Sequence, residues 1–68
     1  MKYSTRNEAI QNEIINAIEA SGIAKASDYD IDAIAELTIE QFSDNGNVWY
    51  ESTVEPDEFW SIVENNAN

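Results

Sequence analysis

The spacing of apolar residues predicts an N-terminal helix over residues 6–20. Ile10, Ile14 and Ile18 recur four residues apart, which places them on one face of a helix. The intervening positions are mostly polar, so the pattern is amphipathic rather than fully apolar. One side of this helix is therefore expected to pack against the core.

Both ends of this helix carry recognisable signals. Thr5 followed three residues later by Glu8 matches a capping box, in which Thr5 is the N-cap. Gly22 suits the left-handed position beyond the C-terminus, and Ile23 is expected to fold back as its hydrophobic contact.

A second helix is predicted to begin within residues 27–30. Ser27, Asp28 and Asp30 are all suitable N-cap residues, and acids in a first turn face the positive end of the helix dipole. Asn45-Gly46 is expected to end this helix, because both residues tolerate a left-handed conformation. The predicted core stripe consists of Ile31, Ile34, Ala35, Thr38 and Phe42.

Residues 47–54 are rich in β-branched and aromatic types, which permits a strand. No second strand is evident to pair with them, so an extended connector is favoured. A third helix follows, with Glu55 as N-cap, Pro56 at the first helical position, and Phe59 and Val63 facing inward. The fold class expected is mainly α, a small three-helix domain with an extended connector before the last helix.

The charge of the chain is concentrated in its C-terminal part. Residues 1–68 form a single acidic domain with 3 basic and 14 acidic residues and a net charge of −11. Residues 26–68 contain eleven acids and no Lys, Arg or His. Nucleic acids and anionic membranes would repel this part, whereas a basic protein surface would attract it. The N-terminus has no apolar run typical of a signal peptide, so a cytoplasmic location is expected.

The residue types argue against catalysis. The chain lacks both His and Cys, which removes the commonest general base and the thiol nucleophile. Asp28, Asp30 and Asp32 open like a calcium-binding loop, but Ala33 and Ile39 occupy the positions that require Gly and Glu. Helix capping is the favoured role of these acids, with a weak, non-selective cation site as the alternative. No enzyme activity, metal or cofactor is predicted.

Five acids recur every fourth residue through the predicted second helix. Residues four apart are neighbours on a helix, where like charges destabilise each other. Such a ladder has a spacing similar to that of backbone phosphates and is suited to a groove lined with Lys and Arg. The five acids are Asp28, Asp32, Glu36, Glu40 and Asp44. Supporting contacts are expected from Asp30, Glu51, Glu55, Asp57 and Glu58.

The small size, one-sided acidity and lack of catalytic residues resemble the nucleic-acid-mimic inhibitors of phages and mobile elements, of the anti-CRISPR or anti-restriction type. The segments "DYDIDAIAE" and "EFWSIVE" are also similar to small proteins encoded in mobile elements. The resemblance implies a non-enzymatic inhibitor that blocks the basic groove of a bacterial defence protein, such as a CRISPR effector or a restriction enzyme. It implies action in the bacterial host cell, without direct binding of nucleic acid or membrane.

An acidic protein–protein interaction module, such as an antitoxin or adaptor, is the alternative. Such a module would bind through exposed aromatic residues, for which Trp49, Tyr50 and Trp60 are the candidates.

Overall fold

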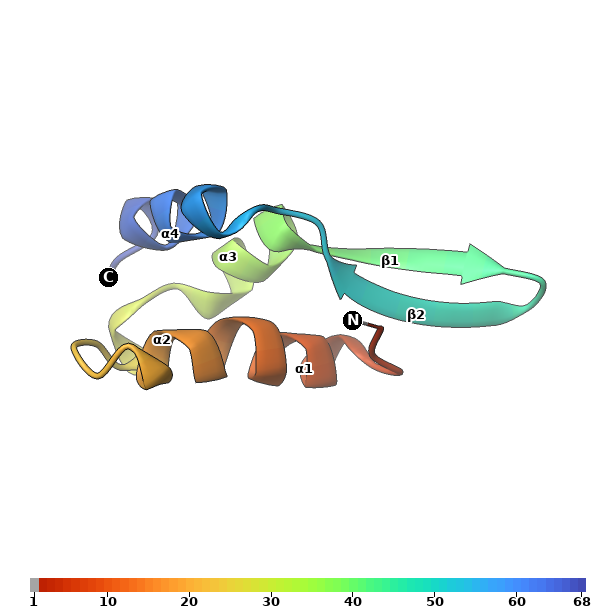
Figure 1. Ribbon diagram of the computed structural model, residues 1–68, viewed down its shortest axis with the longest axis horizontal. Helices are drawn as coiled ribbons and strands as arrows, with labels where there is room; N and C mark the ends of the chain where they lie inside the picture. Colours follow the sequence, from red (N-terminus) through yellow and green to blue (C-terminus); the bar gives the residue numbers. More distant parts are fainter. Residues whose placement is uncertain (1) are drawn as a thin grey trace.

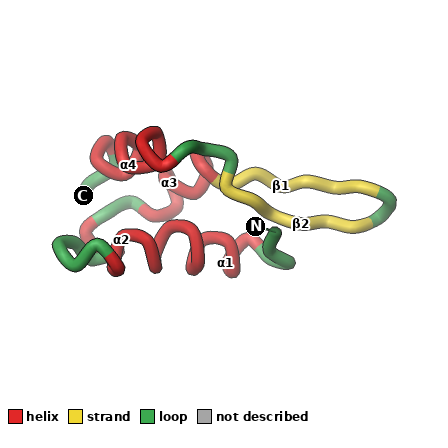
Figure 2. Tube along the Cα trace, in the orientation of Figure 1, coloured by secondary structure: helices red, strands yellow, loops and turns green. Residues whose placement is uncertain are grey.

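The computed structural model describes residues 2–68 and shows an α+β arrangement of helices and one antiparallel hairpin (Figures 1 and 2). The molecule is elongated, with extents of 41 × 18 × 17 Å, because the hairpin projects beyond the helices (Figure 1). The elements in chain order are α1 (Arg6–Ala9), the π-helical η1 (Ile10–Ile15), α2 (Asn16–Ala20), the 3-10 turn η2 (Ala26–Asp28), α3 (Ile31–Thr38), β1 (Ile39–Asp44), β2 (Asn47–Ser52) and α4 (Pro56–Asn65).

The predicted N-terminal helix is confirmed, since α1, η1 and α2 follow one another without a break. The Thr5 hydroxyl accepts a hydrogen bond from the Glu8 amide at 3.1 Å and caps the start. Gly22 has a φ of 77° and takes the left-handed position beyond the end. The expected contact of Ile23 is wrong, because this side chain is 92% exposed.

The core lies between the N-terminal helix, α3 and α4. Among residues 2–68, Thr38 is the polar residue that lies buried in this core. Its hydroxyl donates a hydrogen bond to the Ile34 carbonyl at 2.8 Å, so the buried hydroxyl has a partner within the protein. The predicted inward positions Phe59 and Val63 of α4 are confirmed. The buried apolar residues are Ala9, Ile10, Ile14, Ile18, Ile34, Ala35, Ile39, Phe59 and Val63.

The mainly α prediction is wrong, because the second helix ends at Thr38 and the chain continues as a strand. Ile39 already has extended backbone angles, with φ −105° and ψ 129°. The Thr38 carbonyl accepts a hydrogen bond from the backbone amide of Thr53 at 2.9 Å. A carbonyl left free at the end of α3 thus finds its donor in the residue that follows β2. Residues 47–52 are therefore strand β2 instead of part of a connector, and Phe42 belongs to β1 instead of a helical core stripe.

The hairpin turn consists of Asn45 and Gly46, whose φ angles are 50° and 83°. Two central residues with positive φ match the twist of paired strands, and Asn-Gly is the preferred sequence for such a turn. The turn sets the register in which Phe42 lies opposite Trp49 and Glu40 opposite Glu51. The same Asn-Gly pair that suggested a helix end thus reverses the chain and creates the strand partner that the sequence did not reveal.

Both ends of the described chain are hydrogen-bonded to other segments. Tyr3 and Tyr50 exchange two backbone hydrogen bonds of 2.9 Å, so residues near the N-terminus extend the sheet at the outer edge of β2. At the opposite end of the molecule, the Asp30 amide donates to the Asn66 carbonyl at 2.8 Å. Asn68 donates in turn to the Asp28 carbonyl at 2.9 Å. These bonds fix the base of the hairpin and the start of α3.

Replacing Gly46 tests whether the left-handed turn holds the hairpin. A Cβ at Gly46 would meet no atom within 4 Å, so Gly46→Ala changes backbone preference alone. We expect it to lower the free energy of unfolding by about 1–2 kcal/mol, because a positive φ is unfavourable for Ala. Urea denaturation measures the change. Gly46→Asn is the control and should cost less, since Asn tolerates this conformation; equal losses would contradict the explanation.

Candidate partner-binding interface

The structure does not place the five regularly spaced acids on one surface. Asp28 lies in η2, Asp32 and Glu36 lie in α3, and Glu40 and Asp44 lie in β1. The change from helix to strand after Thr38 ends the four-residue periodicity, because strand side chains alternate between two faces. The continuous helical ladder predicted from the sequence is therefore wrong.

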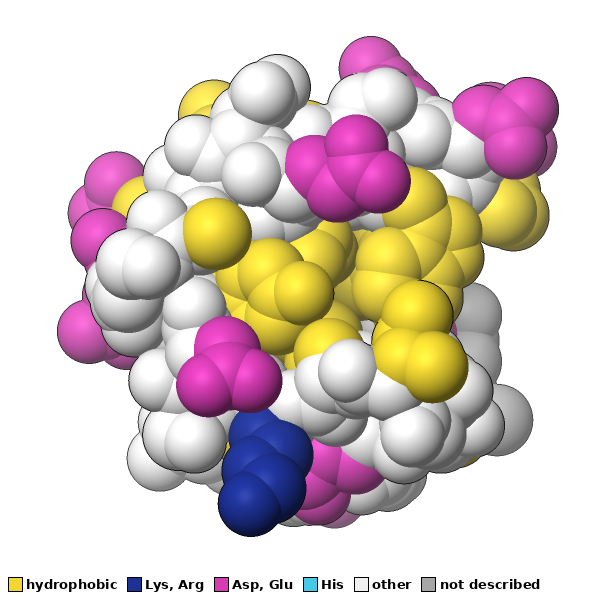
Figure 3. Space-filling model, turned by 90° about the vertical axis from the view of Figure 1, so that its left-hand side faces the viewer, with side chains coloured by type: hydrophobic (Ala, Val, Ile, Leu, Met, Phe, Trp, Pro, Cys, Tyr) yellow, Lys and Arg dark blue, Asp and Glu magenta, His cyan; other side chains and the backbone are white. Residues whose placement is uncertain are grey.

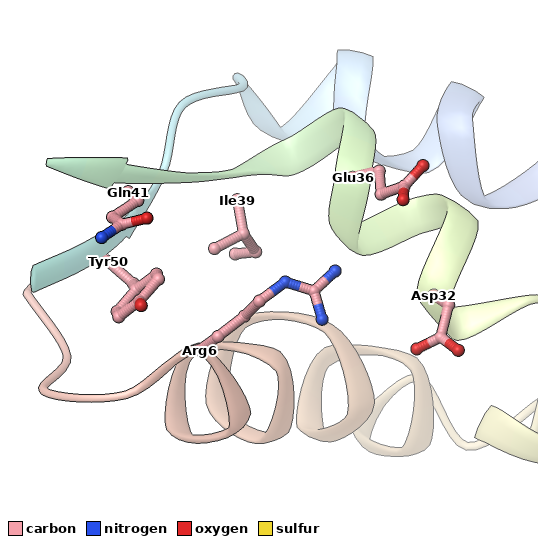
Figure 4. A pocket seen from close by; sticks show the side chains of 6 residues that line it. All are labelled: Arg6, Asp32, Glu36, Ile39, Gln41 and Tyr50. Atoms are coloured by element: carbon pink, nitrogen blue, oxygen red, sulfur yellow. The ribbon is translucent and has the colours of Figure 1, made fainter.

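Asp32 and Glu36 line an open hollow of about 670 Å³ between α3 and the N-terminal helix (Figure 4). Arg6 extends its guanidinium group toward these two carboxylates (Figure 4). The floor of the hollow is formed on the strand side by Ile39, Gln41 and Tyr50. Because Arg6 supplies a positive charge here, this hollow is less negative than the sequence of α3 alone suggests.

The other face of the hairpin carries a denser group of acids. Ile39 and Gln41 point toward the hollow, so the alternating residues of β1 and their partners on β2 point away from it. We call this surface the hairpin acidic face. It consists of Glu40, Phe42 and Asp44 from β1 and Asn47, Trp49 and Glu51 from β2.

An aromatic pair lies at the centre of the hairpin acidic face. The rings of Phe42 and Trp49 are stacked, with centroids 6.0 Å apart and planes 15° from parallel. Both side chains are half-buried. The indole nitrogen of Trp49 is buried and has no hydrogen-bond partner within the described residues 2–68. The pair is therefore a stacked, half-buried apolar centre between carboxylates.

The carboxylates of this face are directly opposed across the strands. Glu40 faces Glu51 in the register, and Cβ atoms of such pairs lie about 4.5–5.5 Å apart. Like charges at this position destabilise a hairpin. Glu40 and Asp44 are exposed, and Glu51 is half-buried. Repulsion between these groups is a cost that a positively charged partner would remove.

One basic side chain reaches the same region. The Tyr3–Tyr50 pairing turns the neighbouring Lys2 toward the Trp49 side of the sheet. Its ammonium nitrogen lies 4.4 Å from the centroid of the Trp49 ring, which is a cation–π contact worth about 0.5–1 kcal/mol at an exposed site. The aromatic pair thus binds a cation of the protein itself.

The supporting acids near helix starts have local structural roles. The Asp30 carboxylate caps α3 by accepting a hydrogen bond from the Ala33 amide at 3.2 Å. The Asp28 carboxylate accepts a hydrogen bond from the Lys25 amide at 3.3 Å. Asp57 and Glu58 lie in the first turn of α4, where carboxylates complement the helix dipole. Glu55 occupies the N-cap position of α4, but its side chain makes no capping hydrogen bond. Each of these acids is exposed, but none belongs to the hairpin acidic face.

The three aromatic candidates differ in exposure. Trp49 and Tyr50 are half-buried in the hairpin, whereas Trp60 on α4 is 38% exposed. The Trp60 ring packs edge-on against Phe59, with centroids 5.0 Å apart. Trp60 is therefore the most accessible of the three.

Tyr3 links the hairpin base to the N-terminal helix. Its hydroxyl donates to the Glu13 carboxylate at 3.1 Å. Burial raises the pKa of Tyr3 above the ordinary value of 10.0, and the hydrogen bond to Glu13 and the negative charges of Glu13 and Glu8 raise it further. The neutral hydroxyl is thus favoured in the folded protein.

Comparison with protein-family models, with curated proteins and with solved structures found no match to this chain. Among residues 2–68, no helix combines the length and apolar character needed to cross a membrane. In the same residues, no three acidic side chains are gathered closely enough to hold a metal ion.

The sequence predicts which acids are candidates for partner binding, but it does not predict how the hairpin brings them together. The pairing of Phe42 with Trp49 and of Glu40 with Glu51 depends on a hairpin that was not predicted. The available signal was Asn45-Gly46, the preferred two-residue hairpin turn, followed by a segment rich in aromatic and β-branched residues. Lys2 was not recognised as part of the site because only the Tyr3–Tyr50 pairing brings it there.

Reversing one charge tests the opposition of Glu40 and Glu51. Glu40→Lys places an ammonium group opposite the Glu51 carboxylate, and we expect the free energy of unfolding to rise by about 0.2–1 kcal/mol. Asp44→Lys is the matched control, because its partner Asn47 is neutral. Urea denaturation at low salt compares the two variants. The opposition would be refuted if both variants gained equally, or if added NaCl left the difference unchanged.

The raised pKa of Tyr3 predicts a loss of stability at alkaline pH. The folded protein retains the hydroxyl proton at a pH where the unfolded chain, with a pKa near 10.0, has lost it. The free energy of unfolding should therefore fall as pH rises from about 10 through the folded pKa. Tyr3→Phe removes this contribution and should make the decline shallower. Denaturation curves measured from neutral to alkaline pH test it, and identical declines in both proteins would contradict it.

Proposed function

We propose that this protein is a non-enzymatic inhibitor that occupies the basic groove of a bacterial nucleic-acid-binding or defence protein, such as a CRISPR effector or a restriction enzyme. It acts in the bacterial host cell by binding that protein, and it binds neither nucleic acid nor membrane itself. The observation that carries the proposal is the hairpin acidic face, where Glu40, Asp44 and Glu51 surround a stacked aromatic pair on a projecting element.

The composition of this face matches what a nucleic-acid groove binds. Grooves for single strands combine positive charge that follows the phosphates with aromatic or arginine side chains on which bases stack. The hairpin acidic face offers both counterparts, carboxylates in place of phosphates and the Phe42–Trp49 stack in place of stacked bases. Arg residues of the groove would meet carboxylates at the rim and an aromatic ring at the centre. The contact of Lys2 with Trp49 is an internal example of this recognition.

The shape of the molecule favours insertion into a groove. The hairpin projects from the helical body, so its two strands can enter a channel that the body cannot (Figure 1). The helical part then remains outside and adds its exposed acids at the entrance. The hairpin acidic face would then occupy the groove in place of the helical ladder expected from the sequence, and the acids of the helical part would surround the entrance.

The electrostatics favour rapid association with a basic partner. The net charge of −11 produces a field that can raise association rates by roughly 10–10³-fold at low ionic strength. Binding also relieves the opposition of Glu40 and Glu51, so the partner stabilises the hairpin. Complex formation should therefore weaken as salt is added.

One observation favours the alternative of an acidic interaction module such as an antitoxin or adaptor. Trp60 on α4 is 38% exposed and is available as an anchor for another protein. In that case the acids would serve mainly to attract the partner and keep the protein soluble.

The inhibitor proposal is tested by DNA-binding assays on a panel of purified CRISPR effectors and restriction enzymes. We expect the wild-type protein to displace DNA from a member of the panel, more strongly at low salt. The double variant Glu40→Lys/Glu51→Lys should weaken this inhibition at least tenfold, because two attractive contacts become repulsive while the fold keeps its register.

Asp57→Lys/Glu58→Lys is the matched control, because it makes the same change in net charge away from the hairpin and should weaken inhibition less. The proposal fails if no member of the panel is inhibited, or if the double variant inhibits as well as the wild type. It fails in favour of the adaptor alternative if Trp60→Gln removes the inhibition and the hairpin variant retains it.

A further inference from the structure

An apolar patch lies at the end of the molecule opposite the hairpin (Figure 3). It lines a shallow hollow of about 260 Å³ between the segment after α2 and the outer side of α4. We call this surface the end patch. Its members are Ile23, Ala24, Tyr29, Trp60 and Val63, with Ser21 and Glu64 at its border.

The exposure of the end patch results from the direction in which the chain turns before Ile23. Gly22 turns the chain so that Ile23 points into solvent with 92% of its surface exposed, instead of folding back onto α2. Trp60 is the other large apolar residue of the patch with substantial exposure. An exposed Ile23 and a partly exposed Trp60 line the same hollow, so they belong to one apolar patch and are not isolated surface residues.

The backbone beneath the patch is held in place. Tyr29 pairs with Ala67, and Asp30 and Asn68 make backbone hydrogen bonds that join the start of α3 to the chain end. Trp60 is held against Phe59 of the core. The hollow is therefore a preformed surface, so a partner would lose little free energy in ordering it.

The charges around the patch indicate the chemistry of its partner. Glu64 borders the hollow, and Asp28 and Lys25 lie in the adjoining one beside Ile23. Acidic side chains flank the yellow apolar surface on several sides in Figure 3. A second copy of the chain would bring another charge of −11 to this surface, and an anionic membrane would be repelled in the same way. An apolar segment flanked by basic residues is the complementary partner.

We propose that the end patch is a second interaction surface, which binds a basic amphipathic helix of a partner protein. Apolar side chains of one helix face would enter the hollow beside Trp60 and Ile23, as in helix-in-groove recognition. Lys or Arg residues at the edges of that face would lie near Glu64 and Asp28. The surface is separate from the hairpin acidic face, so the protein can contact its partner at both ends.

A synthetic helical peptide tests this surface. The probe has Leu at positions i, i+3, i+4 and i+7 and Lys elsewhere, and the control peptide has the same composition in an order without an apolar face. The two indole N–H signals in a ¹⁵N–¹H spectrum report on the two surfaces separately. We expect the probe to shift the Trp60 signal saturably, the Trp49 signal to move less, and the control peptide to bind at least tenfold more weakly.

Two variants complete the test. Ile23→Ser should weaken probe binding at least fivefold without loss of stability, because this side chain makes almost no contact in the free protein. Leu37→Ser is the matched control, since Leu37 is 57% exposed but does not line the hollow, and it should leave binding unchanged. Glu40→Lys should also leave the Trp60 response intact, which separates this result from the outcome for the hairpin.

The proposal is overturned if the control peptide binds as tightly as the probe, because charge alone would then explain the binding. It is overturned equally if Ile23→Ser and Leu37→Ser behave alike, or if only the Trp49 signal responds. Concentration-dependent dimerisation that Ile23→Ser abolishes would assign the patch to a second copy. Binding to vesicles of zwitterionic lipid, in place of the peptide, would assign it to a membrane surface.

Discussion

The left-handed turn at Asn45 and Gly46 is the constraint on which the arrangement of charges depends. A two-residue turn of this type fixes which residues face each other, and a shift by one position would move every side chain to the opposite face. With the observed register, Glu40 meets Glu51 and Phe42 meets Trp49 on one surface. The hairpin acidic face therefore exists because the backbone at two positions adopts positive φ angles.

The apolar core and the acidic surface place opposite demands on a chain of this length. Small domains bury a limited share of their surface, so like-charge repulsion takes a relatively large part of their stability. In the structure the opposition of Glu40 and Glu51 lies in the hairpin, away from the helices that enclose the core. Arg6 lies near two acids of α3, and helix starts stabilise several others.

The two candidate surfaces lie at opposite ends of an elongated molecule and differ in physical character. The hairpin acidic face has charge at its rim and a stacked aromatic centre, so its binding is expected to depend strongly on salt. The end patch has exposed Ile23 and Trp60 beside a preformed hollow, so shape and apolar burial dominate there. A partner that bound both surfaces would associate faster because of the first and would be selected over other proteins because of the second.

The sequence by itself determined the N-terminal helix, the start of α3, and the start and inward face of α4, because caps and periodic apolar residues act over a few neighbouring positions. It also determined the net charge and the absence of His and Cys. Only the tertiary structure decided that α3 stops at Thr38, where the carbonyl is satisfied by Thr53, fifteen residues further along the chain. The exposure of Ile23 is likewise non-local. The grouping of the acids also depends on the fold, since a four-residue spacing of acids is the same in the sequence whether the chain forms a helix or a strand.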